Sequence, residues 1–434
     1  MNTGQFYING SWVNPLEQET FDVINPATER SAAKISMAGT ADVELAVQAA
    51  RSAFPEYMAT TVEQRLGWFS RLLEIYRRRA PEITQAMCTE MGSPLSFTEE
   101  VQTPCGDGHI EVIMEVLAGF EFDTLSPRGG SRVLHEPVGV AALITPWNWP
   151  VNQVVVKVLP ALAAGCTCIL KPSEESPLSA MIFAEMIDEA GFPAGAFSLI
   201  NGSGLLAGAA LAAHPDVDMV SFTGSTRAGI AVAKTAADTV KRVTLELGGK
   251  SPNLLFADAD LVSAVSWSVE ACFSNAGQTC DAPTRLLVER SVYEQAKEIA
   301  TRIAQATKVG DPSVAGDHIG PVVNARQYDN IQRLIQQGID EGANLLAGGT
   351  GRADDREVGY YVKPTLFADV DNDMTINKQE IFGPVLCMMP FDTEDEAIRL
   401  GNDTDYGLGA CIQTSDPVRA DRVARKLRAG TISI

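Results

Sequence analysis

One cysteine lies in a setting that suits chemistry. Cys280 follows a run of small and polar residues that begins at Ser274, and Pro283 comes soon after it. This composition is typical of a tight loop between an apolar helical run and a strand-like run. A thiol on such a loop can reach a cleft, and surrounding backbone NH groups can lower its pKa. The alternative is a buried, inert cysteine, the commoner kind outside disulfides.

Two other polar residues stand among apolar neighbours. Glu246 lies within the mainly apolar residues 243–249. Burying an ionised, unpaired carboxylate there would cost much free energy. We therefore interpret Glu246 as a functional carboxyl with a raised pKa rather than a structural residue. Asn148 lies between two tryptophans, and from its position alone it fits a turn residue as well as a functional amide.

The elements that must position these residues alternate regularly over residues 138–247. A buried strand is predicted at 138–144, further strands at 166–170, 197–200, 217–221 and 242–247, and helices at 152–164, 177–190, 204–213 and 225–236. Strands that alternate with helices specify a parallel, doubly wound sheet. Because such sheets bind ligands beyond the carboxyl ends of their strands, the segments that follow each strand are the candidate binding site.

Lys171 and Glu174 follow the second of these strands. A cation and a carboxylate at this place suit a ribose. The carboxylate would favour a free 2′-hydroxyl and repel a 2′-phosphate, so we predict NAD rather than NADP. A solvated surface pair is the alternative for these two residues.

Gly224 and Ser225 open a predicted helix, whose exposed NH groups suit a pyrophosphate. Gly202, Gly204 and Gly208 approach the dinucleotide-binding spacing GxGxxG but miss it, and they follow the third strand. The glycines alone are therefore a weak signal.

The rest of the chain contains further helices and strands. The first part has a hairpin at 5–13, helices near 43–54, 66–76 and 81–91, and two short strands around 125–134. A second α/β series follows residue 250, with strands at 253–256, 285–289, 361–367, 385–391 and from 430, and helices at 261–272, 291–306, 325–341, 394–400 and 416–427. We therefore expect more than one domain.

Composition narrows the classes of partner. The 434 residues carry a net charge of −21, which makes nucleic acid or an anionic membrane surface an improbable partner. No apolar run of membrane-spanning length and no signal sequence is found, so a cytoplasmic location is the default expectation. The eight cysteines form no CxxC motif, and we expect neither a metal site nor a disulfide framework.

Six motifs resemble, in order and approximate spacing, those of the NAD(P)-dependent aldehyde dehydrogenase superfamily. They are PWNWP at 146–150, KPSE at 171–174, FTGS at 222–225, LELGGKS at 245–251, GQTC at 277–280 and EIFGP at 380–384. The resemblance covers nearly the whole chain. It implies an α/β fold with a doubly wound NAD-binding domain (residues 1–117 and 138–248), a small β oligomerisation flap (118–137) and a second α/β catalytic domain (249–434).

The resemblance also implies a chemical role for three residues. The Cys280 thiolate would attack the aldehyde carbonyl to give a thiohemiacetal. The Asn148 amide and the Cys280 backbone NH would hold the developing oxyanion. After hydride transfer leaves a thioester, Glu246 would activate the water that releases a carboxylic acid.

The cofactor would be bound by residues at the strand ends and near residue 380. Lys171 and Glu174 match the adenosine-ribose contacts of the family, Ser225 the pyrophosphate contact, and Glu380 with Phe382 the nicotinamide-ribose side. The full predicted set is Ile144, Trp147, Lys171, Ser173, Glu174, Gly204, Gly208, Phe222, Gly224, Ser225, Leu247, Glu380 and Phe382.

The chain departs from the family pattern at two places. Asp281 directly follows Cys280, where many relatives have a small or apolar residue. Its carboxylate would oppose thiolate formation if it faced the sulfur. The alternatives are that it points away or makes the substrate pocket favour polar or cationic aldehydes. Family members also continue past the position of Ile434 with a loop at the substrate pocket and a strand used in subunit pairing.

Three hypotheses about the function fit the sequence. The first is an NAD-dependent aldehyde dehydrogenase that acts on a small-molecule aldehyde substrate as a homodimer or homotetramer. The second is a CoA-acylating or semialdehyde-specific dehydrogenase of the same superfamily. Glu246 favours the first, because a hydrolytic enzyme needs a base for water and transfer to CoA does not. The third is a non-catalytic binding protein on the same scaffold, which the presence of Cys280, Glu246 and Asn148 together disfavours.

Overall fold

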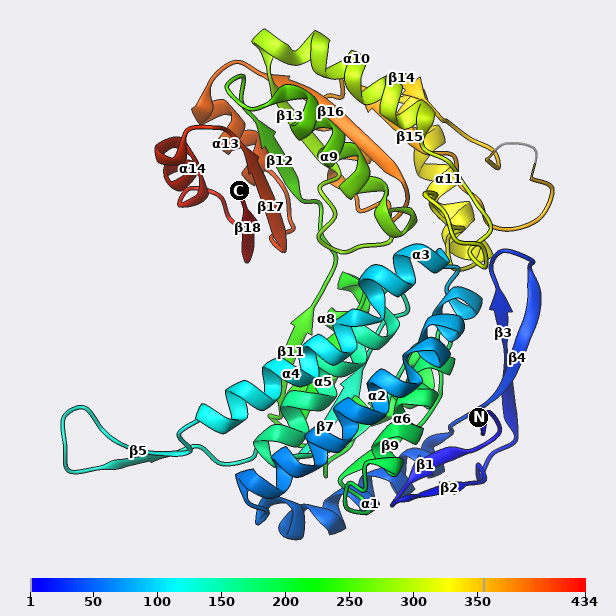
Figure 1. The fold of residues 1–434 in the computed structure, drawn as a ribbon, viewed down its shortest axis with the longest axis vertical. Coiled ribbons are helices and arrows are strands. Elements are labelled where there is room, and N and C mark those ends of the chain that lie inside the picture. Colours follow the sequence, from blue (N-terminus) through cyan, green and yellow to red (C-terminus); the bar gives the residue numbers. More distant parts are fainter. Residues whose placement is uncertain (1, 354–355) are drawn as a thin grey trace. The chain divides into compact units, whose positions relative to one another are not determined.

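The chain folds into two compact units, which are described separately. The computed structural model describes residues 2–353 and 356–434. The first unit comprises residues 1–25, 30–91 and 95–246, and the second comprises 26–29, 92–94 and 247–434 (Figure 1). Apart from the two short segments 26–29 and 92–94, the boundary between the units falls between Glu246 and Leu247, directly after a strand of the first unit.

The first unit is built on a seven-stranded sheet of order β11-β10-β7-β8-β9-β1-β2. The strands are β1 (Phe6–Ile8), β2 (Ser11–Val13), β7 (Val140–Ile144), β8 (Thr167–Lys171), β9 (Phe197–Leu199), β10 (Met219–Thr223) and β11 (Arg242–Glu246). The five strands from β11 to β9 are parallel, and the hairpin β1–β2 adds antiparallel to β9. The predicted parallel sheet and the predicted N-terminal hairpin are confirmed.

Helices of the first unit pack against this sheet and against one another. They are α1 (Thr40–Met58), α2 (Val62–Glu90), α3 (Leu95–Phe97), a π-helical turn (Thr98–Gln102), α4 (Pro104–Gly119), α5 (Pro150–Ala164), α6 (Leu178–Glu189), a second π-helical turn (Gly204–Gly208), α7 (Ala209–Ala213) and α8 (Thr226–Ala237). All five residues of β7 and of β8 are buried, as expected for central parallel strands.

The prediction of a separate helix near 81–91 was wrong, because α2 runs unbroken through Pro81. A proline inside a helix removes one backbone hydrogen bond. Here the buried apolar stripe continues on both sides of Pro81, with Phe69 and Tyr76 before it and Ile83 and Met87 after it. Packing of that stripe outweighs the lost hydrogen bond.

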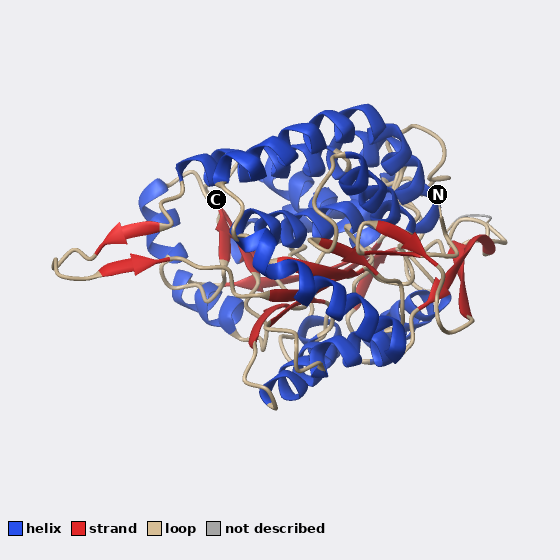
Figure 2. Ribbon diagram, turned by 90° about the horizontal axis from the view of Figure 1, so that it is seen from below, coloured by secondary structure: helices blue, strands red, loops and turns tan. Residues whose placement is uncertain are grey.

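Two hairpins lie outside the main sheet of the first unit. The pair β3 (Glu19–Asn25) and β4 (Arg30–Met37) was not predicted, because only four of its fifteen residues are buried and its apolar pattern is weak. The short strands β5 (Asp123–Leu125) and β6 (Arg132–Leu134) confirm the strand pair predicted around 125–134. Figures 1 and 2 both show the β5–β6 hairpin projecting away from the helices of its unit.

The second unit has its own seven-stranded sheet, of order β14-β15-β16-β13-β12-β17-β18. Its strands are β12 (Pro252–Leu255), β13 (Arg285–Glu289), β14 (Asn344–Ala347), β15 (Thr365–Ala368), β16 (Val385–Phe391), β17 (Gly409–Gln413) and β18 (Thr431–Ser433). Its helices are α9 (Leu261–Phe273), a 3₁₀ turn (Ser274–Gly277), α10 (Arg290–Ala306), α11 (Ala325–Asp340), α12 (Thr375–Lys378), α13 (Glu394–Asn402) and α14 (Pro417–Ala424).

The sequence missed two strands of this sheet and misplaced the start of a third. The unpredicted strands are β14 and β17, which have four and five residues. The strand predicted from residue 361 starts only at Thr365. Pro364 precedes it and has no backbone NH to donate to a neighbouring strand.

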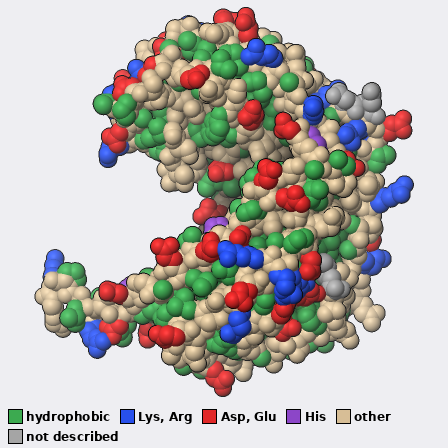
Figure 3. Space-filling model, viewed as in Figure 1, with side chains coloured by type: hydrophobic (Ala, Val, Ile, Leu, Met, Phe, Trp, Pro, Cys, Tyr) green, Lys and Arg blue, Asp and Glu red, His purple; other side chains and the backbone are tan. Residues whose placement is uncertain are grey.

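The surface of each unit carries charged side chains of both signs. Figure 3 shows acidic and basic side chains interspersed over the visible face of each unit. Within the described residues, no helix combines the length and the apolar character that crossing a membrane would require.

Candidate active site

The predicted cofactor residues of the first unit follow strands that end at one edge of its sheet. Ile144 is paired with Lys171 on one side and with Phe222 on the other, and Thr223 is paired with Glu246. The ends of β7, β8, β10 and β11 are therefore aligned. The structure brings these predicted residues to one edge, where parallel sheets bind ligands.

Lys171 and Glu174 are not a solvated surface pair, so that alternative was wrong. The Lys171 side chain is only 3% exposed. Its ammonium donates to the carbonyl oxygen of Pro172 at 2.8 Å, to that of Gly202 at 2.5 Å and to Glu174 Oε2 at 3.4 Å. Burial lowers the pKa of Lys171, and the Glu174 carboxylate opposes that effect. Lys171 thus holds a partly exposed carboxylate at the end of β8.

The glycine-rich segment after β9 differs from the continuous α-helix predicted over 204–213. It begins with the π-helical turn Gly204–Gly208, whose N-terminus is capped by Ser203, and only then becomes α7. A Cβ atom at Gly208 would lie 3.8 Å from Lys171 Cδ and 3.9 Å from Ile144 Cδ1. Gly208 is therefore brought to the ends of β7 and β8, whereas the position of a Cβ at Gly204 has open space around it.

Ser225 caps α8, as the sequence predicted for a helix start. Its hydroxyl accepts a hydrogen bond from Ala228 N at 3.4 Å. The backbone NH of Gly224 donates to the carbonyl oxygen of Glu246 at 3.0 Å. The loop predicted to bind the pyrophosphate is thus fastened to the residue predicted to act as base.

Glu246 is exposed at the end of β11, so its predicted burial was wrong. The physical reason is that β11 is the edge strand of its sheet, and its apolar residues alternate with exposed ones. A buried cation, Lys157, lies near this carboxylate. Lys157 of α5 donates to Ser221 Oγ at 2.9 Å, and burial lowers its pKa to about 8 although the charge of Glu246 opposes the shift. A lysine in an otherwise apolar helical run was the available signal.

Asn148 is buried, with 3% of its surface exposed, in the turn between β7 and α5. Trp147 beside it is half-buried. The ring of Trp149 packs edge-on against Phe97, with 5.6 Å between ring centroids. The turn that carries the predicted oxyanion donor is therefore held by aromatic packing rather than free in solvent.

The Cys280 loop in the second unit starts in a constrained backbone conformation. Directly after α9, Asn275, Ala276 and Gly277 have φ angles of 54°, 54° and 72°. Left-handed φ angles are unfavourable for residues other than glycine and persist only where surrounding contacts hold them. Such strain is common at functional sites.

Gln278 supplies part of that support from a fully buried position. It donates to the carbonyl oxygen of Asn275 at 3.1 Å, and its own side-chain oxygen accepts from Val323 N at 2.9 Å. Asn275 Nδ2 donates back to the Gln278 carbonyl oxygen at 3.3 Å. These hydrogen bonds fix the residues that lead into Cys280.

Cys280 is half-buried, and its pKa shift is opposite to the expectation. Burial raises the pKa of the thiol to about 12, and the charges of Asp281 and Glu380 add to the increase. Backbone NH groups at Cys280 and Asp281 lower it, as predicted, but are outweighed. Without cofactor or substrate the thiol therefore keeps its proton at neutral pH. The exposed carboxylate of Asp281 contributes to the raised pKa of Cys280.

Close backbone packing joins three of the six motifs within the second unit. Gly249 N donates to Glu380 Oε1 at 3.1 Å. A Cβ at Gly249 would collide with the carbonyl oxygen of Cys280, and a Cβ at Gly277 would collide with that of Gly383. Only glycine allows these approaches. These glycines belong to motifs found in the sequence, but the sequence did not predict which backbone atoms pack against them.

The structure places the predicted site residues in two groups. Leu247, Cys280, Glu380 and Phe382 belong to the second unit, where Phe382 has a left-handed φ of 58°. The other predicted catalytic and cofactor residues belong to the first unit.

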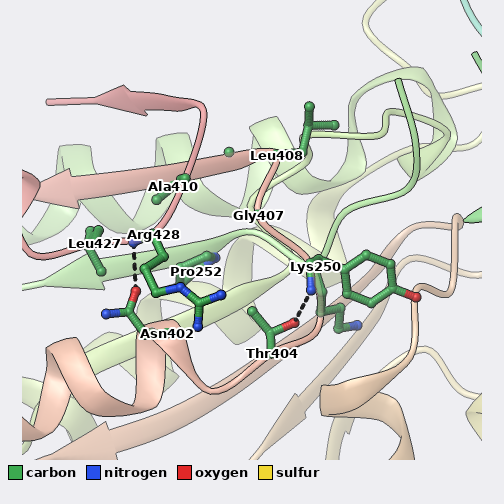
Figure 4. Close-up of a pocket in the computed structure, with 13 residues that line it drawn as sticks. Lys250, Pro252, Asn402, Thr404, Gly407, Leu408, Ala410, Leu427 and Arg428 are labelled. Atoms are coloured by element: carbon green, nitrogen blue, oxygen red, sulfur yellow. Dashed lines mark hydrogen bonds between the residues drawn. The ribbon is translucent and has the colours of Figure 1, made fainter. Parts of the chain in front are cut away.

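A small hollow lies elsewhere in the second unit (Figure 4). Lys250, Thr404, Tyr406 and Arg428 are among its polar lining residues. Within the described part of the chain, its lining includes none of the predicted catalytic or cofactor residues. We therefore do not assign the chemistry to it.

Comparison with known proteins identifies relatives over almost the full chain. The model of the aldehyde dehydrogenase family matches residues 12–434. A 3-succinoylsemialdehyde-pyridine dehydrogenase from a Pseudomonas species is 46% identical over 99% of this chain and 90% of that protein.

Solved structures agree with this match. An aldehyde dehydrogenase from Bartonella henselae superposes with a TM-score of 0.98 at 49% identity, covering 99% of this chain and 90% of that one. A mutant of aldehyde dehydrogenase C from Pseudomonas syringae, in complex with NAD⁺ and octanal, has a TM-score of 0.98 at 47% identity, covering 100% of this chain and 89% of that one. The resemblance and the fold class predicted from the sequence are confirmed.

Proposed function

The chain belongs to the aldehyde dehydrogenase family, whose members oxidise aldehydes with NAD(P), and from that premise we propose which residues perform the reaction. Cys280 is the nucleophile, Asn148 the oxyanion donor and Glu246 the base. The product is a carboxylic acid. The NAD-binding role falls to the first unit and the nucleophile to the second.

One observation carries this assignment. Gly249 packs directly against the carbonyl group of Cys280, and Glu246 precedes Gly249 by only three residues. Three residues of chain span at most about 11 Å. One short segment, residues 246–249, therefore contains both the proposed base and the glycine that contacts the Cys280 carbonyl group.

The raised pKa of Cys280 requires a base before the thiol can attack. Solvent water is the proposed acceptor of the thiol proton, which leaves the Glu246 carboxylate unprotonated for the later hydrolysis. The sulfur then bonds to the carbonyl carbon of the aldehyde. The Asn148 amide and the Cys280 backbone NH hold the resulting oxyanion.

Bound NAD would supply the hydride acceptor, and loss of hydride from the thiohemiacetal carbon would leave a thioester on Cys280. Glu246 next takes a proton from water, whose oxygen attacks the thioester carbon. The carbon–sulfur bond breaks, the acid leaves and the Cys280 thiol is restored.

The site residues of the first unit suit the adenosine end of NAD, since Lys171 and Glu174 form a fixed, partly exposed polar pair at the strand ends.

NAD is preferred over NADP in this proposal because Glu174 offers a negative charge to the ribose. Lys171 holds that carboxylate in place. The test is the ratio of kcat/KM with the two cofactors. A ratio that favours NADP or shows no preference would contradict the assignment.

Hydrolysis is favoured over transfer to CoA because Glu246 is present and accessible. A panel of aldehydes with NAD and without CoA tests this choice. Sustained NADH formation is expected for at least one aldehyde. Turnover that requires CoA would overturn the hydrolytic assignment, and no NADH with any aldehyde would favour a non-catalytic binding protein. The panel should include semialdehydes, since the relative cited above is named for one.

Homo-oligomerisation, as a dimer or tetramer in the cytoplasm, is also part of the proposal. It is supported by large apolar side chains that remain exposed on α4 and on the β5–β6 hairpin, among them Val112, Val116, Leu125 and Leu134. Exposed apolar surface of this kind marks interaction sites. Sedimentation velocity would test it, with a monomer at assay concentration as the contrary result.

A further inference from the structure

We propose that Glu90 is a positioning residue for cofactor binding, acting from the end of α2 on the first turn of α6. The segment between β8 and α6 carries Ser173 and Glu174. The inference rests on the proposed cofactor role of that segment. Glu90 lies in none of the motifs singled out from the sequence.

Glu90 is a fully buried carboxylate, with 0% of its surface exposed. Its Oε1 atom accepts from Ser179 N at 3.1 Å and from Ser179 Oγ at 2.6 Å, and Oε2 accepts from Leu178 N. All three donors belong to the first turn of α6. A negative charge at this end of a helix is also favoured by the helix dipole.

The helix needs this residue because it has no cap of its own. Pro177 occupies the N-cap position of α6, and no side-chain hydrogen bond is made from there. The first NH groups of a helix have no partner within it. Glu90, which precedes Leu178 by 88 residues, takes the place of the missing cap. Its loss would leave buried donors unpaired.

The cofactor segment is short and is fixed at both ends. Only residues 172–177 separate Lys171, the last residue of β8, from Leu178. Lys171 is held at one end by the Gly202 carbonyl, and Glu90 holds the other end. Inside the segment, Ser176 N donates to the carbonyl oxygen of Ser173 at 3.2 Å.

Movement of the α6 N-terminus would therefore be passed on to the cofactor segment. Glu175 N donates to Ser173 Oγ at 3.3 Å, which leaves little slack between Glu174 and α6. A shift of the first turn would displace Glu174 relative to Lys171. The consequence falls on cofactor affinity and on the choice between NAD and NADP, not on the chemistry at Cys280.

The test is isothermal titration of NAD into the full chain, carried out at pH 8. That pH lies above the pKa of Glu90, which burial raises to about 7 against the effect of its hydrogen bonds. The variant Glu90→Gln keeps the side-chain shape but turns an NH₂ group toward the helix donors. We expect its Kd for NAD to rise about five- to twentyfold, with a smaller preference for NAD over NADP and kcat at saturating NAD within about twofold of wild type.

The matched control is Asp218→Asn in the same unit. The Asp218 carboxylate also accepts a hydrogen bond from a backbone NH group, that of Val140, at 2.7 Å. Val140 is the first residue of β7, so this contact lies at the opposite end of the strands from the cofactor residues. We expect this variant to lower the Tm without changing the Kd for NAD. If Glu90→Gln does not fold, Glu90→Asp keeps the charge with a shorter side chain, and an intermediate rise in Kd is expected.

Three results would overturn the proposal. They are a wild-type Kd for NAD in folded Glu90→Gln or Glu90→Asp, an equal rise in Kd in the Asp218→Asn control, and a loss of kcat with unchanged KM for NAD. Failure of the wild-type chain itself to bind NAD would instead refute the proposed function, and the role of Glu90 would fall with it. The two failures are thus distinguishable.

Discussion

Replacing Gly249 by alanine is the perturbation that tests the geometry of the site most sharply. Gly249 has no left-handed φ angle, so alanine can adopt its backbone conformation. The effect of the substitution is therefore steric. The new Cβ would lie 2.1 Å from the carbonyl oxygen of Cys280, whereas an ordinary contact needs at least 3.4 Å.

The size of the expected loss follows from this distance. The nucleophile loop and Gly249 must separate by about 1.3 Å, since the obstacle is backbone and not a flexible side chain. A misplacement of about 1 Å costs on the order of 100-fold in rate. That factor corresponds to about 2.7 kcal/mol of activation free energy. We expect kcat of Gly249→Ala to fall by about 100-fold.

The assay is steady-state oxidation of an accepted aldehyde with saturating NAD, combined with thermal unfolding. Gly108→Ala is the control, because no atom lies within 4 Å of the added Cβ and alanine is favoured over glycine inside a helix such as α4. The control should keep wild-type kcat. A folded Gly249→Ala enzyme with kcat within threefold of wild type would refute the argument that this backbone contact positions Cys280.

Further predictions concern the charges around the site. Asp281→Asn removes a negative charge that raises the pKa of Cys280, so the thiolate fraction should increase. The rate of iodoacetamide labelling of Cys280 at pH 8 should then increase several-fold. An unchanged rate would show that Asp281 does not act on the thiol. In the wild type that labelling rate should rise about tenfold per pH unit between pH 8 and 10, because the pKa lies near 12. Glu174→Gln should raise kcat/KM with NADP relative to NAD about tenfold, and an unaltered ratio would exclude Glu174 from the choice of cofactor. Gly248→Ala places a Cβ 2.2 Å from Glu380 Oε2, which is the end of a flexible side chain and can be displaced. Because Glu380 is assigned to the cofactor, KM for NAD should rise more than kcat falls. The reverse pattern would contradict the role given to Glu380.

The sequence alone supported the parallel sheet and the location of the cofactor residues. Both follow from local patterns, because buried strands such as β7 and β8 alternate with helices and polar residues follow directly at their ends. The ends of parallel strands meet at one edge whatever the rest of the fold. Lys171 and Glu174 could therefore be predicted as one site.

Other features depend on residues distant in sequence and could not be predicted. The pKa of Cys280 is raised first by burial, then by Asp281, which the sequence places beside it, and then by Glu380, a hundred residues further on. The burial and the Glu380 contribution could not be predicted from the residues around Cys280. The exposure of Glu246 depends on β11 being an edge strand. The capping of α6 by Glu90 joins residues 88 apart. No local pattern carries these facts.

The central claim is that Cys280 forms the acyl intermediate that Glu246 helps water to release. It is tested most directly by mass spectrometry of Glu246→Gln after mixing with NAD and an accepted aldehyde. We predict one equivalent of NADH in a burst and an acyl adduct on the peptide that contains Cys280. Steady NADH production without an adduct, or an adduct confined to another cysteine such as Cys105, would contradict the account.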